Sequence, residues 1–316
     1  MTKAVSGKTG LTPLQRLEIA AVRAVMRLMR ALGPVQASNL GGWLARTTGP
    51  LMPVSDVVRR NLAHAMPQLD PGARRRVLLA CWDNLGRTVA ELPFVATLGP
   101  TAAGPGWEIK GLENLAPLLP GAGPAIVLTG HIANWEVVLA ALRDRGVRLA
   151  AFYRPSPNPA INELVAELRD RPVMGGHGAD ANAGSAPMFA KGASGARGAL
   201  GFLRGGGVIG ILADQKMNDG VQATLFGQPA MTASALASLA LRFGCPVIPV
   251  HTERLGPARM RVVIDPPLVQ PQTADRNDGV LAITQAANDR LEQWITARPG
   301  EWLWMHRRWP KPLYIR

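Results

Sequence analysis

A histidine, His131, is followed five residues later by a carboxylate, Glu136, and both come directly after a short apolar run at residues 125–129. That run is partly β-branched and bounded by Pro and Gly, so it indicates a buried strand, and the residues up to about 142 indicate a helix. The pair therefore lies at a turn from strand to helix. A carboxylate that fixes one ring nitrogen leaves the other able to take a proton, which indicates general-base chemistry on a hydroxyl group.

The two side chains can meet only if the histidine precedes the helix. Residues five apart on a regular helix are rotated by about 140°, because each residue advances about 100°. We therefore expect His131 on the turn and Glu136 on the second turn of the helix. A substrate alcohol could then attack an activated acyl group directly, without a Ser or Cys nucleophile. The alternative is a structural histidine beside a solvated glutamate.

This motif and four later segments resemble the lipid A late acyltransferases. The string H-I-A-N-W-E at residues 131–136 is similar to the H-x-G-N-W-E of that family, with Ala133 in place of Gly. An alanine suits this position only if the backbone does not need a positive φ angle. The later segments, in order, are Y-R-P with N-P at 153–159, A-D-Q at 213–215, F-G-Q-P-A-M-T at 226–232 and W-L-W-M-H-R-R-W at 302–309.

The resemblance implies transfer of a fatty acyl chain from an acyl carrier protein thioester, or acyl-CoA, to a hydroxyl of a lipid A precursor. The base would be His131, held by Glu136. Arg154, or in second place Arg169, would stabilise the oxyanion, although either could be a surface ion-pair residue. We expect no cofactor, because this chemistry needs none, and no metal, because the Cys and His residues lack metal-ligand spacing.

Polar residues near and after the motif could hold the acceptor, whose anionic groups suit Lys and Arg. We expect this of Lys216, Arg307 and Arg308. Asp214 follows the apolar run at 208–212, and ligand sites of α/β proteins lie at such strand ends, so it could orient an arginine or a sugar hydroxyl, or cap a turn. Asn134 could donate to the acceptor or lock the turn. The Trp cluster at 302–309 suits a membrane interface and core packing equally.

The N-terminal region has the composition of a membrane-surface helix. Residues 1–10 are expected to be a disordered tail and residues 11–34 an amphipathic helix that lies on the membrane. Its apolar stripe comprises Leu14, Leu17, Ala21, Val25, Leu28 and Leu32. Residues 1–60 hold nine Lys/Arg against two Asp/Glu, which favours an anionic surface. The alternative is a soluble helix whose stripe packs on the core; a membrane span is disfavoured by the arginines.

Residues 35–316 are expected to form a single α/β acyltransferase domain with a mixed, mostly parallel sheet flanked by helices. The expected strands are 107–112, at an edge, 125–129, 148–153, 208–212, 247–250 and 260–264. The expected helices are two within 55–93, followed by 134–142, 160–170, 195–204, 234–243 and 280–297. Residues 175–190, rich in Gly and Ala, are expected to be a mobile loop near the site.

Bulk composition limits the function classes. The chain has 316 residues, 47% of them hydrophobic, and a net charge of +13. It has no apolar run of about 18 residues and no secretory signal, so we expect a peripheral or monotopic protein on the cytoplasmic face of the inner membrane. No nucleic-acid reader motif is present, whereas an anionic membrane and an acidic acyl carrier protein fit the charge. Two alternatives stay open: an acyltransferase acting on another glycolipid, a phospholipid or an amino-acid lipid, and a non-catalytic membrane-bound scaffold.

Overall fold

The computed structural model of the chain describes residues 12–153, 156, 158–161, 164, 187–190, 192–271, 273 and 275–315. In this part of the chain the main sheet has seven strands, in the order β1-β9-β8-β2-β5-β3-β4. The strands are β1 (Gly106–Lys110), β2 (Ala125–Thr129), β3 (Leu149–Tyr153), β4 (Met188–Ala190), β5 (Val208–Leu212), β8 (Val247–Gly256) and β9 (Arg259–Ile264). Only the β8–β9 pair among these neighbours is antiparallel, which confirms the expected mixed, mostly parallel sheet.

The two central strands that carry the site are buried on both faces. All of β2 and most of β5 are inaccessible to solvent, as expected for parallel strands that read as continuous apolar runs. The register pairs Thr129 with Leu212, so both strands end at the same level. The residues that follow them therefore emerge side by side at the carboxyl edge of the sheet, although β3 and β4 come between them in sequence.

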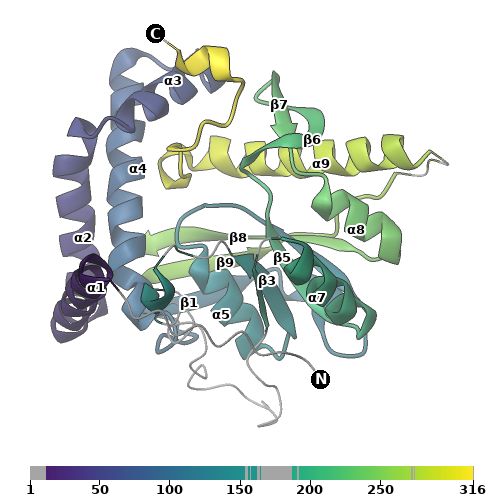
Figure 1. Cartoon of the computed structure of the whole chain (residues 1–316), viewed down its shortest axis with the longest axis horizontal. Helices are drawn as coiled ribbons and strands as arrows, with labels where there is room; N and C mark the ends of the chain where they lie inside the picture. The colour runs from purple at the N-terminus through teal and green to yellow at the C-terminus, as the bar shows by residue number, and fades with distance from the viewer. Residues whose placement is uncertain are drawn as a thin grey trace.

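Helices cover both faces of the sheet, as Figure 1 shows for α9 on one side and α5 on the other. The helices of this half are α5 (Glu136–Asp144), α7 (Ala193–Arg204), α8 (Ala235–Phe243) and α9 (Arg276–Ala297). The N-terminal helices are α1 (Pro13–Leu32), α2 (Pro34–Thr48), α3 (Ser55–Ala65) and α4 (Pro71–Glu91). Short 3-10 turns are η1 (Gly49–Leu51), η2 (Leu92–Phe94), η3 (Leu112–Asn114), η4 (Ala116–Leu118), η5 (Pro299–Glu301) and η6 (Lys311–Tyr314).

Helix α2 was not expected from the sequence, because it contains two consecutive glycines and few strong helix formers. Tertiary packing against α4 explains it. A Cβ atom at Gly41 would lie 2.4 Å from the carbonyl oxygen of Gly86, and one at Gly86 would lie 2.1 Å from the carbonyl oxygen of Gly41. The glycines thus allow the two backbones to touch, at the cost of low intrinsic helix propensity.

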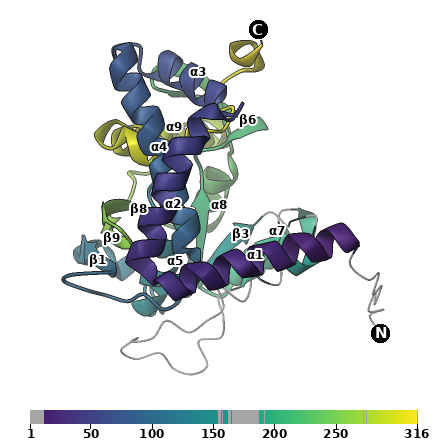
Figure 2. The same cartoon turned by 90° about the vertical axis from the view of Figure 1, so that its left-hand side faces the viewer.

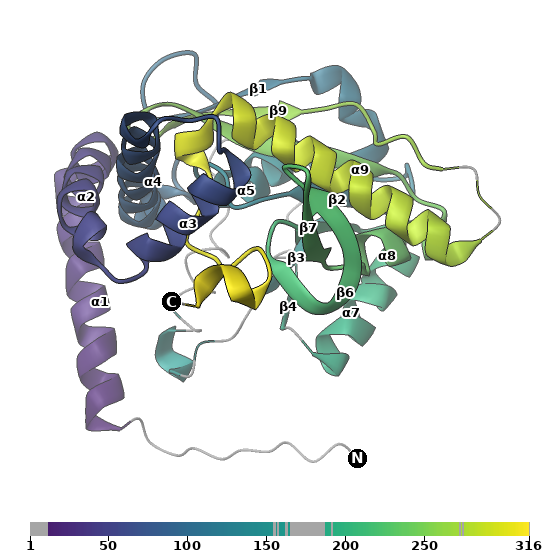
Figure 3. The same ribbon diagram turned by 90° about the horizontal axis from the view of Figure 1, so that it is seen from above.

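The β6–β7 hairpin was also missed. β6 (Lys216–Leu225) and β7 (Gln228–Thr232) pair antiparallel in a separate two-stranded sheet. They are joined by Phe226 and Gly227, whose φ angles are 56° and 67°, as a two-residue hairpin turn requires. The hairpin lies beside α9 (Figure 3), where Asn288 donates to the carbonyl of Thr224 at 2.8 Å. Neither strand could be predicted, because their sequences are largely polar and do not alternate between apolar and polar residues.

Most of the other helices and strands begin and end close to the residues expected from the sequence. The expected edge strand is β1, which pairs with β9 alone among the described strands. The expected helix at 160–170 and most of the expected loop at 175–190 lie outside the described residues. The loop's last residues, Met188–Ala190, form β4 instead, because they pair with β3 and extend the sheet.

Helix α1 turns its apolar stripe outward. Leu14, Leu17, Val25 and Leu28 are between 53% and 75% exposed, whereas Ile19 packs on Ala160 and Leu164. The stripe therefore does not pack on the core of the described structure. Figure 2 shows α1 and α2 on one face of the molecule. Among the described residues, no helix is long and apolar enough to cross a bilayer.

Replacing Gly86 by Ala should weaken the fold, since the added methyl group would force α2 and α4 apart. We expect a loss of about 1–3 kcal/mol in the free energy of unfolding, measured by urea denaturation. Gly201→Ala on α7 is the matched control, because a Cβ atom there meets nothing within 4 Å. It should be neutral or stabilising by up to about 1 kcal/mol. Equal stability of the two variants would contradict the close α2–α4 contact.

Candidate active site

The site is centred on a histidine and a buried aspartate that follow adjacent strands. His131 lies two residues after the end of β2, and Asp214 lies two residues after the end of β5. Nδ1 of His131 lies 2.9 Å from Oδ1 of Asp214, and the backbone N–H of His131 donates to Oδ2 at 2.8 Å. The Asp214 side chain is fully buried, whereas the His131 side chain is 15% exposed. Asp214 thus holds the imidazole at Nδ1, while part of the ring is accessible to solvent.

The carboxylate of Asp214 stays ionised despite its burial. Burial by itself raises the pKa of Asp214, but attraction to His131, the hydrogen bonds from that residue and attraction to His306 together hold the pKa well below its usual range. Nε1 of Trp302 donates a further hydrogen bond to Oδ2 at 2.8 Å. A buried carboxylate with three such donors is a fixed negative charge beneath the imidazole.

This geometry sets the tautomer of His131. An ionised carboxylate only accepts, so Nδ1 must carry a proton, and in the neutral imidazole Nε2 then carries the lone pair. The structure thereby corrects the expectation that Glu136 holds the imidazole at this nitrogen: the Nδ1 contact belongs to Asp214. Glu136 is the first residue of α5, not a residue of its second turn. Asp214, expected to bind substrate or cap a turn, instead serves the histidine.

The turn that carries the histidine is strained and firmly held. Ala133 has a φ angle of 47°, the left-handed region that favours glycine, so the backbone does need the conformation that its alanine disfavours. Its carbonyl oxygen accepts from Nδ2 of Asn84 at 3.2 Å and from Oγ1 of Thr88 at 3.0 Å. Its N–H donates to the carbonyl of Glu301 at 2.9 Å. These contacts offset a strain of about 1–2 kcal/mol.

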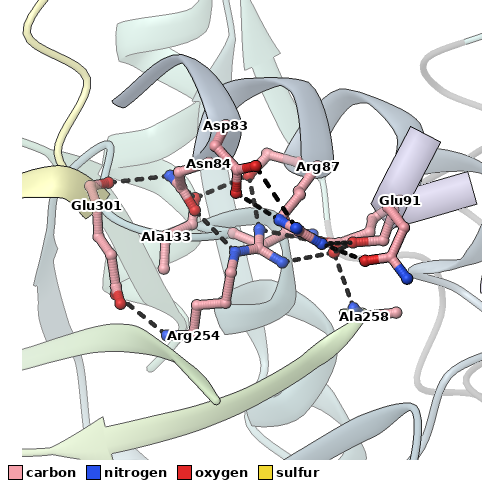
Figure 4. A network of polar contacts seen from close by, with 12 residues as sticks. Asp83, Asn84, Arg87, Glu91, Ala133, Arg254, Ala258 and Glu301 are labelled. Carbon is pink, nitrogen blue, oxygen red and sulfur yellow. Dashed lines mark hydrogen bonds and ion pairs between the residues drawn. The ribbon is translucent and has the colours of Figure 1, made fainter. Parts of the chain in front are cut away.

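A buried ion pair anchors the same turn from α4 (Figure 4). Glu91 is fully buried and pairs with Arg254 of β8 through Nη1 at 2.5 Å and Nη2 at 3.1 Å. Nδ2 of Asn134 donates to the same carboxylate at 2.8 Å. Nε of Arg254 donates to Oδ1 of Asn84, which ties the pair to the Ala133 contacts. Asn134 is therefore fully buried in the turn and locks it, one of its two expected roles.

The C-terminal segment closes the site from the other side. Trp302 forms an isolated antiparallel bridge with Ile132, and Leu303 donates to the carbonyl of His131 at 3.0 Å. Trp302, Trp304 and Trp309 are at most 1% exposed, so the tryptophans pack in the core and do not reach a membrane interface. The segment thus contributes its indole rings to the support of the histidine.

His306 is a site residue that the sequence analysis did not single out. Its ring centroid lies 5.2 Å from that of His131. The ring of Trp135 also packs on the imidazole of His131, with 5.0 Å between their centroids. Burial lowers the pKa of His306 to about 4, so the ring is neutral near pH 7. Its buried Nε2 finds no hydrogen-bond partner among the described residues. The W-L-W-M-H-R-R-W motif contained this residue, but only the fold places it against His131.

His131, Asp214 and His306 also form a cluster of possible metal-ligand atoms, all within 4.8 Å of one another. Both carboxylate oxygens of Asp214 already accept hydrogen bonds from His131 or Trp302. The arrangement is therefore suited to proton transfer at Nε2 of His131, with the charge of the resulting imidazolium balanced by Asp214.

The other expected site residues fall into three groups. Arg154 and Arg169 lie outside the described residues. Arg308 is fully buried, and its guanidinium donates to the carbonyl of Met231 and to Oγ1 of Thr232, so it braces β7 and does not face an acceptor. Lys216 begins β6, and Arg307 lies over the ring of Tyr314 at 5.9 Å from its centroid.

Comparison with known proteins places this site in a family. The family model described as bacterial lipid A biosynthesis acyltransferase matches residues 6–311. Phosphatidylinositol mannoside acyltransferase of Mycolicibacterium smegmatis is 26% identical over 293 residues, which cover 90% of this chain and 88% of that protein. The protein of the same name from Mycobacterium tuberculosis is 24% identical over 273 residues, covering 84% of this chain and 79% of that protein.

One solved structure is also similar. The crystal structure of the 1-acyl-sn-glycerophosphate acyltransferase PlsC from Thermotoga maritima aligns with 90% of this chain and 98% of its own. The sequence identity is 11% and the TM-score is 0.40.

The neutral state of His306 predicts a pH dependence of stability. Below pH 6.5 the unfolded chain binds a proton at this residue, whereas the folded protein does so only near pH 4. Stability therefore falls as the pH decreases from 6.5 to 4, by up to roughly 3 kcal/mol from this group. Urea denaturation across this range should show a shallower decrease for His306→Gln than for the unsubstituted protein. Parallel curves would show that folding does not lower the pKa of His306.

Proposed function

Because the chain belongs to the bacterial lipid A biosynthesis acyltransferase family, we propose that it transfers a fatty acyl chain from a thioester to a hydroxyl of a sugar-bearing lipid. That the protein is a lipid acyltransferase follows from its family and from relatives that are named acyltransferases. The observation that carries the finer proposal is the His131–Asp214 pair, a base and a buried carboxylate at the carboxyl edge of the sheet.

The proposed reaction uses Nε2 of His131 as the base. It takes the proton of the acceptor hydroxyl as the oxygen attacks the thioester carbonyl and forms a tetrahedral intermediate. Asp214, directly behind the ring, stabilises the imidazolium. The intermediate collapses, the carbon–sulfur bond breaks, and the imidazolium returns the proton to the departing thiolate. The products are an ester and a thiol, so no oxidant or further reactant is needed.

Stabilisation of the oxyanion remains assigned to Arg154, with Arg169 as the second candidate. Both precede the A-D-Q segment of Asp214, and a cation near the developing charge is what the tetrahedral intermediate needs. His306 is an additional candidate for contact with the reacting groups, because its neutral ring lies against that of His131. A neutral imidazole can donate or accept a hydrogen bond without adding charge.

Two sugar-bearing acceptors are considered. The sequence motifs favour a lipid A precursor, the class after which the family is described. The relatives at 24–26% identity are named for phosphatidylinositol mannoside and favour a mannoside-bearing phospholipid. Both acceptors present a sugar hydroxyl and a phosphate, so the same base serves either. Lys216 and Arg307 are the proposed phosphate contacts, and an acyl carrier protein thioester or acyl-CoA is the proposed donor.

We place the protein at the cytoplasmic face of an anionic membrane, the inner membrane of the cell. The exposed stripe of α1 is supported by further exposed apolar side chains on and after α2. These are Trp43, Leu44, Leu51 and Met52. Arg23, Arg27 and Arg30 lie exposed on the same helix α1 as the stripe, the combination that binds acidic bilayer surfaces. A non-catalytic scaffold would have no need of the buried carboxylate beneath His131.

Lipid mass spectrometry of a deletion strain tests the proposal directly. Restoring the unsubstituted gene should return one acyl chain to a sugar-bearing lipid, whereas His131→Ala should not, because the base is gone. The lipid that changes identifies the acceptor, lipid A or a mannoside. Recovery by His131→Ala would favour the scaffold, and a change confined to lipids without sugars would rule out both sugar-bearing acceptors.

Asp214→Asn tests the pair itself. The amide cannot stabilise an imidazolium and turns a donor toward the N–H groups of His131 and Trp302. We expect kcat for acyl transfer to fall by about 10²–10⁴-fold, with circular dichroism used to check folding. Asp219→Asn is the control, an exposed carboxylate on β6 whose loss should leave kcat unchanged. A near-normal kcat for Asp214→Asn would mean that the Nδ1 contact is not needed.

A further inference from the structure

A basic cavity lies away from the histidine, where the N-terminal helices meet. It has a volume of about 570 Å³ and is bounded by the end of α2, by η1, and by parts of α3 and α4. Its described lining includes four arginines and no Asp or Glu: Arg46, Arg59, Arg74 and Arg75. A concave site with this charge attracts an anion.

The charge of this cavity is only partly compensated. Arg59 pairs with Asp56 at 2.6 Å. Arg46 approaches Asp83 only to 3.9 Å, and that carboxylate already holds Arg87 at 2.5 Å. Arg75 is exposed and forms no ion pair with the described residues. Arg74 likewise forms no ion pair with the described residues, so three of the four cations lack a close carboxylate.

A neighbouring cavity shows the contrast. It has about 720 Å³, shares Arg46 and lies behind the catalytic turn. Its lining includes Asp83 and Glu301, which pair with Arg87 and Arg298, and Arg254 pairs with Glu91. Most of its arginines are thus neutralised within the protein. The smaller cavity is the one with positive charge left for a ligand.

Arg74 gives a second, independent sign of a ligand. Its Nη2 donates to the carbonyl of Pro67 at 2.8 Å, but its buried Nε–H has no acceptor among the described residues. A buried donor without a partner costs about 1–3 kcal/mol, and a ligand that supplied an acceptor would remove that cost. A phosphate oxygen in the cavity would supply the acceptor.

The rest of the lining is apolar except for Thr47. Leu62, Leu78 and Leu79 line the cavity, and Leu51 at its rim is 86% exposed. Arg46 follows the exposed Trp43 and Leu44 on α2, and α2 shares a face with α1 (Figure 2). Phosphate-binding cations beside apolar side chains match a ligand with an anionic head and a hydrocarbon tail.

We propose that this cavity binds the phosphate headgroup of an anionic phospholipid and so fixes the enzyme on the bilayer in one orientation. The site is distinct from the acceptor contacts at Lys216 and Arg307. The proposal rests on the proposed membrane association, but it does not depend on the acyl transfer chemistry. Arg46 and Arg75 bind the phosphate as cations, and Nε of Arg74 donates to it.

The test is calorimetric titration with a short-chain phosphatidylglycerol below its micelle concentration. The unsubstituted protein should bind one molecule, and Arg46→Gln/Arg75→Gln should bind at least about tenfold more weakly. Arg74→Lys keeps the charge but removes the Nε–H, and it should also weaken binding. Arg46 and Arg75 are exposed, so their replacement should leave the melting temperature near normal.

The matched control is Arg23→Gln/Arg27→Gln on α1, which removes the same charge outside the cavity. It should leave the titration unchanged but weaken binding to vesicles that contain phosphatidylglycerol. If the two double variants lose affinity equally in the titration, the site is only diffuse attraction and the proposal is wrong. Failure of the site would leave the acyltransferase assignment intact, because no acyl transfer is measured.

Two further titrations identify the ligand's source. Inorganic phosphate should compete weakly, because it lacks the tail that contacts Leu62 and Leu78. Phosphate that binds as tightly as the lipid would overturn the lipid assignment in favour of a free phosphate. If the cavity variants bind lipid normally but lose affinity for acyl carrier protein, the occupant is an acidic protein surface and the proposal is also overturned.

Discussion

The buried carboxylate of Asp214 is the interaction on which the rest of the site depends. It accepts hydrogen bonds from the ring and backbone of His131 and from Trp302, and so joins β2, β5 and the C-terminal segment. Such a charge is stable inside a protein only when donors and a cation surround it. A Cβ atom at Gly130 would lie 2.9 Å from Cδ2 of Leu291 and 3.4 Å from Cγ of Asp214, so a side chain there would press on Leu291 beside the carboxylate. The proposed base and the local stability of the turn therefore depend on the same buried carboxylate.

A second buried charge, Glu91, holds the turn from the opposite side. It accepts from Arg254 and Asn134, while Asn84 and Thr88 on the same helix hold the carbonyl of Ala133. The turn is thus fixed in a conformation that an alanine avoids by itself. Removal of either charged partner would leave the other buried and uncompensated, which links the packing of α4 on β8 to the position of the imidazole.

The charges are also divided in space. Most charged side chains around the histidine form ion pairs within the protein. Arginines without a close carboxylate lie instead on the N-terminal helices, beside exposed apolar side chains. Buried pairs make the proposed active site rigid, and exposed cations are left for external anions. Asn61 connects the two regions, because this α3 residue donates to the carbonyls of Trp304 and His306. The proposed membrane contact and the proposed active site thereby share one rigid frame.

The sequence by itself determined the strand-to-helix turn of His131, the buried strands on either side, the mostly parallel sheet and the family. Each of these depends on local pattern or on motifs that are contiguous in the chain. The sequence did not identify Asp214 as the partner of the histidine. That contact depends on β5 lying beside β2, and no local sequence pattern predicts the order of strands in a sheet. Helix α2 and the positive φ of Ala133 were hidden for the same reason: contacts from distant residues overcome weak helix propensity and backbone strain. Only the tertiary structure could place Asp214 and His306 around His131, because long-range packing decides which strand ends and chain segments meet.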